Sequence, residues 1–193
     1  MSAADPVATE RTTPRLRLRP ITAALVDDLW ELHQDPGIAA WYGGARSVEH
    51  TAAAAAAMQR SWISGGLGKW LAYDGVTGEL IGRGGPSRTE VLDREDVEIG
   101  WAVRQRFWRR GYATEIGRAS LDFIDQTTDA DTVIAFTEVH NRGSRAVMER
   151  LGMVYDREIR RPGLVEGVEG VRDDARFAVY SSKRASRRLN QAE

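Results

Sequence analysis

Two hydrophobic periods occur in the first 40 residues of the chain. Residues 15–21, RLRLRPI, place Leu16 and Leu18 between arginines, which is the alternation of a half-buried strand. A helix is predicted to begin after Thr22, a candidate N-cap, and to end near residues 35–37, where Asp-Pro-Gly interrupts the pattern. The leucines that share one face of this helix are Leu25, Leu29 and Leu32.

Residues 47–103 change from a helical to a strand period. A capping hydroxyl at Ser47 and an alanine run predict a helix that ends at the glycines of 65–66. The runs KWLAY and ELIGRGG are separated by the turn-rich residues 74–78 and therefore predict a β-hairpin. The alternating run VEIGWAV at 97–103 predicts a third antiparallel strand.

Beyond Gly111 the period returns to 3.6 and predicts a helix of about four turns. A β-branched run at 132–139 then predicts a buried strand, and residues 141–152 predict a short helix that ends at a glycine. Strand, helix and strand in this order form a βαβ unit with parallel strands. A last strand is expected at 176–182, after a loop at 160–175. The expected fold class is α+β, with a mixed and mostly antiparallel sheet.

Length and composition are consistent with one ordinary domain. With 193 residues and 42% hydrophobic residues, the chain can bury a sizeable core without disulfides. We expect a loose N-terminal segment at 1–13, a single domain at 14–182, and a frayed charged tail at 183–193. The polar start is not a signal peptide and no run approaches a membrane-spanning length, so a soluble cytoplasmic protein without a membrane partner is expected.

Charge and cysteine content exclude several functions. A net charge of -1 argues against a nucleic-acid protein held by a broad basic field. The absence of cysteine removes thiolate nucleophiles and cysteine-ligated metals. The scattered positions of His33, His50 and His140 show no metal-ligand spacing, so no metal site is predicted.

The stretch QRFWRRGYATE at 105–115 runs through a glycine straight into the long helix. The N–H groups of a helix N-terminus attract anions when a tight turn lets the backbone approach. Gly111 permits that approach, and Arg109 and Arg110 can fork onto phosphate oxygens. A surface turn with solvated arginines is an equally simple interpretation. Nucleotide-hydrolase and dinucleotide fingerprints are absent here.

The stretch EIGWAVRQRFWRRGYATEI, followed by EVHNRGSRAVMERLGM, resembles the GNAT superfamily of acetyl-CoA-dependent N-acetyltransferases, and more narrowly its RimJ/RimL-type branch. The resemblance extends over about 14–182 through RLRLRPI and GELIG. Trp108 departs from the Gln or Arg that opens the turn motif in the family. The resemblance implies a GNAT fold in which the strands at 97–103 and 132–139 splay apart around the cofactor, with helices flanking the sheet.

The resemblance also implies roles for individual residues. Backbone of the first strand would pair with the pantetheine of acetyl-CoA, the turn and helix start would hold its diphosphate, and two residues of the short helix would reach the cofactor. In that order these residues are Trp101, Ala102 and Val103; Arg109, Arg110, Gly111, Tyr112, Ala113 and Thr114; and Asn141 and Arg145. Homodimers are common in the family.

Transfer of an acetyl group to a primary amine needs a proton acceptor and a stabilised oxyanion, and direct attack on the thioester needs no nucleophilic side chain. Glu98 is the candidate base by family position, and a solvent-facing strand glutamate is the alternative. The tyrosine that many relatives use as general acid is missing between Arg142 and Leu151. Ser144 or water is the remaining candidate, and Ser144 could equally help to cap the helix.

No motif in the sequence identifies the acceptor amine. Trp41 and Tyr42 are candidates for the acceptor pocket or for core packing. Four acidic residues in the expected loop could attract a cationic amine, either a protein N-terminus, which branch resemblance favours slightly, or a small molecule. They are Glu166, Glu169, Asp173 and Asp174. A non-catalytic acetyl-CoA sensor or interaction module is the alternative function.

Overall fold

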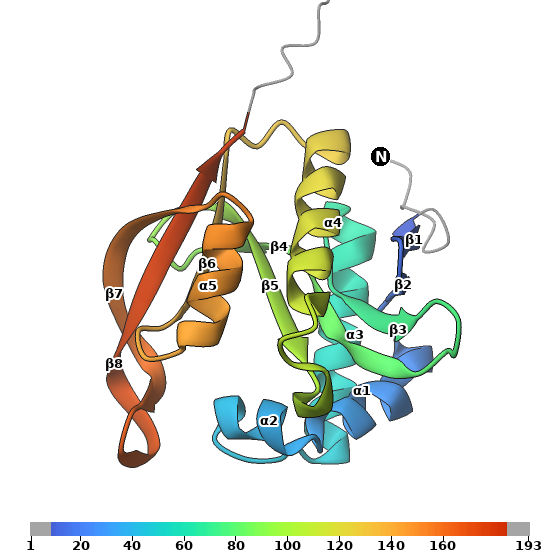
Figure 1. The fold of residues 1–193 in the computed structure, drawn as a ribbon, viewed down its shortest axis with the longest axis horizontal. Coiled ribbons are helices and arrows are strands. Elements are labelled where there is room, and N and C mark those ends of the chain that lie inside the picture. The colour runs from blue at the N-terminus through green and yellow to red at the C-terminus, as the bar shows by residue number, and fades with distance from the viewer. Residues whose placement is uncertain (1–8, 185–193) are drawn as a thin grey trace, which may run out of the picture.

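The computed structural model describes residues 9–184, which form an eight-stranded sheet in the order β1-β2-β3-β4-β5-β6-β8-β7 (Figure 1). Every neighbouring pair is antiparallel except β5 and β6, which are parallel. The strands are β1 (Arg11–Thr12), β2 (Leu16–Pro20), β3 (Trp70–Asp74), β4 (Leu80–Thr89), β5 (Asp96–Val103), β6 (Thr132–Glu138), β7 (Val154–Val165) and β8 (Val168–Lys183). The predicted mixed, mostly antiparallel sheet is confirmed.

The helices also follow the predicted pattern for the most part. Ser47 caps the long helix α3 by accepting a hydrogen bond from the His50 N–H, as its position predicted. The helices are η2 (Ala23–Leu25), α1 (Val26–His33), α2 (Pro36–Ala39), η3 (Ala40–Tyr42), α3 (Val48–Gly65), η4 (Gln105–Phe107), α4 (Tyr112–Thr127) and α5 (Arg142–Arg150). The short α2 was not predicted, although Asp35 caps it and Pro36 opens it.

Strand alternation distributes the core over both faces of the sheet. Trp70 and Ala72 of β3 pack into a cluster with α4 and α5, whereas Leu71 and Tyr73 face a second cluster with α1 and α3. In the first cluster the rings of Trp62 and Trp70 each make a T-shaped contact with the Phe123 ring. The face that carries α4 and α5 is turned to the viewer in Figure 1.

Two boundaries and one loop differ from the sequence prediction. β1 lies within the segment expected to be loose, because it pairs with β2 and because the Trp70 indole donates to the Thr9 carbonyl at 2.8 Å. At the other end β8 includes Lys183, and Arg184 forms an ion pair with Asp125. The remaining terminal residues, 1–8 and 185–193, lie outside the described part of the chain.

The expected loop at 160–175 is instead most of a β-hairpin made by β7 and β8. Its turn lies between Val165 and Val168, which pair with each other. Sequence periodicity missed β7 because most of the strand is exposed, so its side chains do not alternate between polar and apolar. This hairpin forms the long arm at the left of Figure 1.

Candidate active site between the diverging strands

The turn that enters α4 presents backbone N–H groups. Gly111 is the N-cap of the helix with φ +84°, and Arg109 also has a left-handed φ of +61°. Left-handed residues in a turn gather N–H groups into a concave anion seat. The described residues supply no side-chain cap for α4. The N–H groups of its first turn, at Tyr112, Ala113 and Thr114, are therefore available to a ligand.

Arg15 of the neighbouring strand segment holds this turn in place. Its guanidinium donates to the Arg110 carbonyl at 2.9 Å and to Glu115 Oε2 at 2.7 Å, and it lies 4.4 Å from the centre of the Tyr112 ring. Burial raises the pKa of Glu115, but hydrogen bonds from Thr13 and Arg15 outweigh it and leave the pKa lowered. No pattern in the sequence indicates this role of Arg15, because Arg15 lies about 95 residues before the turn.

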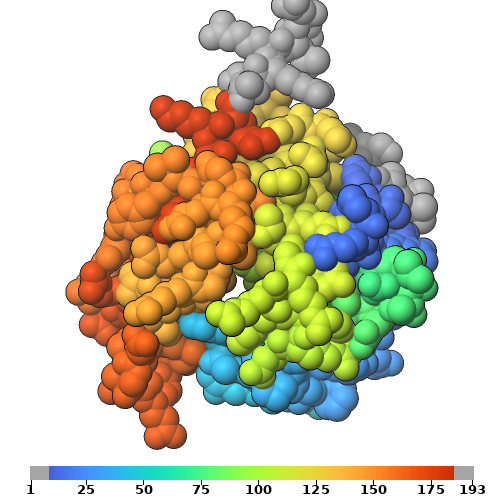
Figure 2. Space-filling model, in the orientation of Figure 1, coloured from blue at the N-terminus to red at the C-terminus, as the bar shows by residue number. Residues whose placement is uncertain are grey.

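The strands on either side of the predicted slot separate where the resemblance places them. β5 pairs with β6 only at Val97 with Val133 and at Glu98 with Ile134. Beyond Glu98 the paired neighbour of β5 within residues 9–184 is β4 alone. Figure 2 shows the surface hollowed between α5 and the segment that leads into α4. The β6-facing edge of residues 100–103 is therefore free of a strand partner.

One carbonyl of that edge has a side-chain partner. The indole of Trp108 donates to the Val103 carbonyl at 2.7 Å. Trp108 is the residue that departs from the family motif, and this hydrogen bond ties the turn to the end of β5. A pantetheine amide that reached Val103 would share the carbonyl oxygen with the indole.

Glu98 lies on the sheet face opposite to Val97 and Ile99, as predicted, and it is not a free surface glutamate. Ser87 Oγ donates to its Oε1 at 2.7 Å, and Lys69 Nζ lies 3.3 Å from the same oxygen. Lys69 also donates to the Gly85 carbonyl at 2.8 Å. Burial lowers the pKa of Lys69, and the Glu98 carboxylate opposes that shift. The carboxylate is thus anchored through Oε1, and no hydrogen bond or ion pair within residues 9–184 uses Oε2.

The predicted residues of α5 are largely engaged within the protein. Asn141 Oδ1 accepts from the Ser144 N–H at 3.1 Å and caps the helix, while Asn141 Nδ2 donates to Thr137 at 3.0 Å. Arg145 donates to the Tyr180 hydroxyl and to the Val139 carbonyl. The cap is therefore Asn141 and not the Ser144 hydroxyl. Contacts of Asn141, Ser144 and Arg145 with a cofactor or substrate stay predictions.

Aromatic contacts join η3 to segments that are distant along the chain. Trp41 stacks on His140 with ring centres 5.3 Å apart, so η3 reaches the end of β6. A side chain at Gly43 would come within 3.2 Å of Val171, which places the turn after η3 against the β7–β8 arm. The rings of Tyr42 and His33 make a T-shaped contact, with their centres 5.8 Å apart. Both Trp41 and Tyr42 are half-buried and join segments far apart in the chain.

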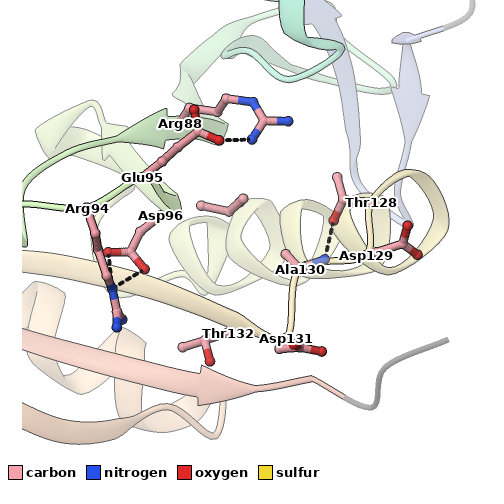
Figure 3. Close-up of a pocket in the computed structure, with 10 residues that line it drawn as sticks. Arg88, Arg94, Glu95, Asp96, Thr128, Asp129, Ala130, Asp131 and Thr132 are labelled. Carbon is pink, nitrogen blue, oxygen red and sulfur yellow. Dashed lines mark hydrogen bonds and ion pairs between the residues drawn. The ribbon is translucent and has the colours of Figure 1, made fainter. Parts of the chain in front are cut away.

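Two hollows lie away from these contacts. One, of about 640 Å³, begins beside Gly111 and follows α4 past Arg118. The other, of about 500 Å³, lies at the opposite end of β5 and is lined in part by the ion pairs Arg88–Glu95 and Arg94–Asp96 (Figure 3). The second hollow is therefore separate from the predicted slot.

Residues 9–184 contain no cluster of three or more histidine, aspartate or glutamate side chains placed to hold a metal ion. Among the same residues, no helix is both long enough and apolar enough to cross a membrane.

Comparison with known proteins decides the family. Residues 15–154 match the model of the acetyltransferase (GNAT) domain. The chain belongs to the GNAT acetyltransferase family. The GNAT chain is 30% identical over 154 residues to the uncharacterized protein YkkB of Bacillus subtilis, covering 79% of the chain and 90% of YkkB.

Solved GNAT structures share the fold. An acetyltransferase from Agrobacterium tumefaciens is 26% identical with a TM-score of 0.69, over 91% of this chain and 94% of that one. RimL, a ribosomal L7/L12 alpha-N-protein acetyltransferase in complex with coenzyme A, is 17% identical with a TM-score of 0.72, over 90% and 96% of the two chains. The predicted GNAT fold and acyltransferase class are confirmed.

Proposed function

We propose that this GNAT protein transfers the acetyl group of acetyl-CoA to a primary amine by direct attack on the bound thioester. The observation that carries the proposal is the divergence of β5 and β6 after Glu98, next to the uncapped first turn of α4. An extended amide chain can pair with the free strand edge while its diphosphate meets the N–H groups of the turn. Structures of GNAT relatives with CoA or acetyl-CoA support this choice of cofactor.

In this proposal the backbone of Trp101, Ala102 and Val103 holds the pantetheine, and residues 109–114 hold the diphosphate. Arg109 and Arg110 are exposed, and no carboxylate of the described chain forms an ion pair with either. Their guanidinium groups are therefore available to phosphate oxygens. Acetyl-CoA supplies the activated acyl group, and the protein supplies orientation and charge.

Glu98 is the proposed base. The amine nitrogen forms a bond to the acetyl carbon as the carbon–sulfur bond breaks, and the amine proton passes to Glu98 directly or through one water. Anchoring of Oε1 by Ser87 and Lys69 leaves Oε2 for this transfer. Lys69 and Ser87 are positioning residues in this mechanism, since they act through the carboxylate.

The leaving thiolate takes a proton from Ser144 or from water. Ser144 stands in the first turn of α5 and is half-buried, and α5 has no tyrosine. A backbone N–H near residues 101–103 is the proposed donor to the oxyanion.

A peptide or protein α-amine is the favoured acceptor, with a small-molecule amine second. RimL, a fold neighbour, is an alpha-N-protein acetyltransferase. The acidic residues predicted to attract a cation lie on the exposed hairpin arm, and Asp174 forms an ion pair with Arg160. They therefore offer little support for a cationic acceptor.

A non-catalytic acetyl-CoA sensor is the second candidate, favoured by the missing tyrosine of α5. Titration with acetyl-CoA, followed by release of free thiol in the presence of amines and N-terminal peptides, separates the two. We expect binding and amine-dependent thiol release. Binding of acetyl-CoA without thiol release in the presence of any amine would favour the sensor. Absence of acetyl-CoA binding would overturn both candidate functions.

A further inference from the structure

Tyr42 is surrounded by positive charge that has no acidic partner. The guanidinium carbons of Arg46 and Arg83 lie 5.2 Å and 5.6 Å from the centre of its ring. Arg83 Nη2 also donates to the Tyr42 hydroxyl. The ion pairs found within 9–184 include neither arginine. Two half-buried cations beside one ring repel each other unless an anion joins them.

Unsatisfied nitrogens gather at the same place. The buried side-chain atoms without a hydrogen-bond partner in the described chain are His33 Nε2 and Arg83 Nε. Both belong to residues that contact Tyr42, and the His33 side chain is almost completely buried, with only 4% exposed. Buried polar atoms in native proteins normally have a partner. The hydrogen bonding of the Arg83 guanidinium is therefore incomplete within the described chain.

This cluster faces the acceptor side of the sheet. Arg83 lies opposite Ala102 in the β4–β5 register, and Ser87 lies opposite Glu98, so their side chains share one face. The two positions are four residues apart, about 13 Å along the strand at a rise of 3.3 Å per residue. Lys69 bridges the interval, because it contacts Glu98 and the Gly85 carbonyl and because the charge of Arg83 lowers its pKa.

We propose that the acceptor is a primary amine that also carries an oxyanion, a carboxylate or a phosphate, held by Arg83 and Arg46 beside Tyr42 while the amine lies at Glu98. This inference rests on the proposed acetyl transfer and narrows its acceptor. For a peptide, a spacing on the order of 10 Å places the anion on the second or third residue. Guanidinium groups bind both anions by forked hydrogen bonds, so both belong to one ligand chemistry.

The test compares matched peptides that differ only at residues two and three. Aspartate, phosphoserine and asparagine are placed there in turn, and kcat/KM is measured with saturating acetyl-CoA. We expect the wild type to prefer an acidic peptide over the asparagine peptide by at least about 10-fold. The aspartate and phosphoserine arms tell a carboxylate from a phosphate.

The variants Arg83→Gln and Arg46→Gln should each reduce this preference several-fold, with little change for the asparagine peptide. Arg88→Gln is the matched control on β4, because Arg88 pairs with Glu95 at the far end of the strand. Arg46 lies in the loop between η3 and α3 rather than in the sheet, so its variant tests the inference even where Arg83→Gln reduces folding.

Equal rates with acidic and neutral peptides would overturn the inference, as would an acidic preference that survives both substitutions. Each result would leave acetyl transfer itself intact. Absence of transfer to every peptide and amine, with acetyl-CoA bound, would instead overturn the proposed enzymatic function.

Discussion

At the N-terminus of α4 the proposed diphosphate seat is built on backbone N–H groups, whose directions are set by the φ angles of Arg109 and Gly111, and the side chains of Arg109 and Arg110 add charge to it. On the opposite face of the sheet the working groups are side chains, with Glu98 held by Lys69 and Ser87. The backbone seat depends on consecutive residues and tolerates variation in side chains. The side-chain site is formed by residues that are distant along the chain, so the contribution of each side chain can be tested by a single substitution.

Removing the base should have the largest effect. With Glu98→Gln we expect acetyl transfer at neutral pH to fall about 100-fold or more, because a positioned general base contributes on that scale. Affinity for acetyl-CoA should change little, since the two functions lie on different faces. Steady-state rates and calorimetric titration measure the two quantities.

Glu95→Gln is the control for that substitution, because Glu95 is an exposed residue in the hollow at the far end of β5. Unchanged rates in the Glu98 variant would remove this residue from the mechanism.

His33 is expected to make the stability of the folded protein depend on pH. Burial, together with the charges of Arg83, Arg46 and His50, lowers the pKa of His33 to about 4. The unfolded chain takes up a proton near pH 6.5 while the folded protein does not, so stability is full above that pH and falls as the pH drops towards 4. We expect His33 to account for a loss of about 2 kcal/mol between pH 7 and pH 5.

Urea unfolding at the two pH values checks this expectation. His33→Gln should reduce the pH-dependent loss. His50→Gln, at an exposed neighbour on α3, should keep most of it, because the His50 charge is the smallest of the named causes of the His33 shift. An identical pH dependence in the wild type and the His33 variant would contradict the assignment.

A substitution in the turn before α4 should weaken acetyl-CoA binding and leave the environment of Glu98 unchanged. Gly111→Ala places a side chain at φ +84°, a left-handed angle that costs about 1–2 kcal/mol in other residues. We expect affinity for acetyl-CoA to fall about 10-fold.

Gly78→Ala imposes similar strain at φ +74° in the β3–β4 turn and should leave acetyl-CoA affinity unchanged. Equal binding by both variants would show that the turn before α4 does not seat the diphosphate.

The smallest effect is expected where a residue acts through another. Lys69→Met removes one of the two donors to Glu98 Oε1, and we expect kcat to fall about 5-fold because the carboxylate is less well oriented. Acetyl-CoA affinity should stay constant. Lys183→Met is the control, since Lys183 is exposed at the end of β8. A loss equal to that of Glu98→Gln would instead give Lys69 a direct part in proton transfer.

Local patterns predicted most of the fold. Alternation in 97–103 and the 3.6-residue period after Gly111 predicted β5 and α4, and the βαβ order predicted the parallel pair. β7 was not predicted, because the strand is mostly exposed and its polar and apolar side chains do not alternate. Pairing with β8, rather than a buried face of its own, holds β7 in place. A strand of this kind is specified by its partner.

The sequence alone determined the turn at Gly111 and the sheet face on which Glu98 lies, because glycine punctuation and strand alternation are properties of neighbouring residues. The choice of Glu98 as the base came from the family resemblance and stays a prediction. Only the tertiary structure brought Lys69 and Ser87 to Glu98, Arg15 to the Arg110 carbonyl, and Arg46, Arg83 and His33 to Tyr42. Strand register and helix packing determine which of these residues come into contact. Residues that meet only when the sheet forms have no characteristic spacing along the chain, so the sequence pattern does not reveal their contacts.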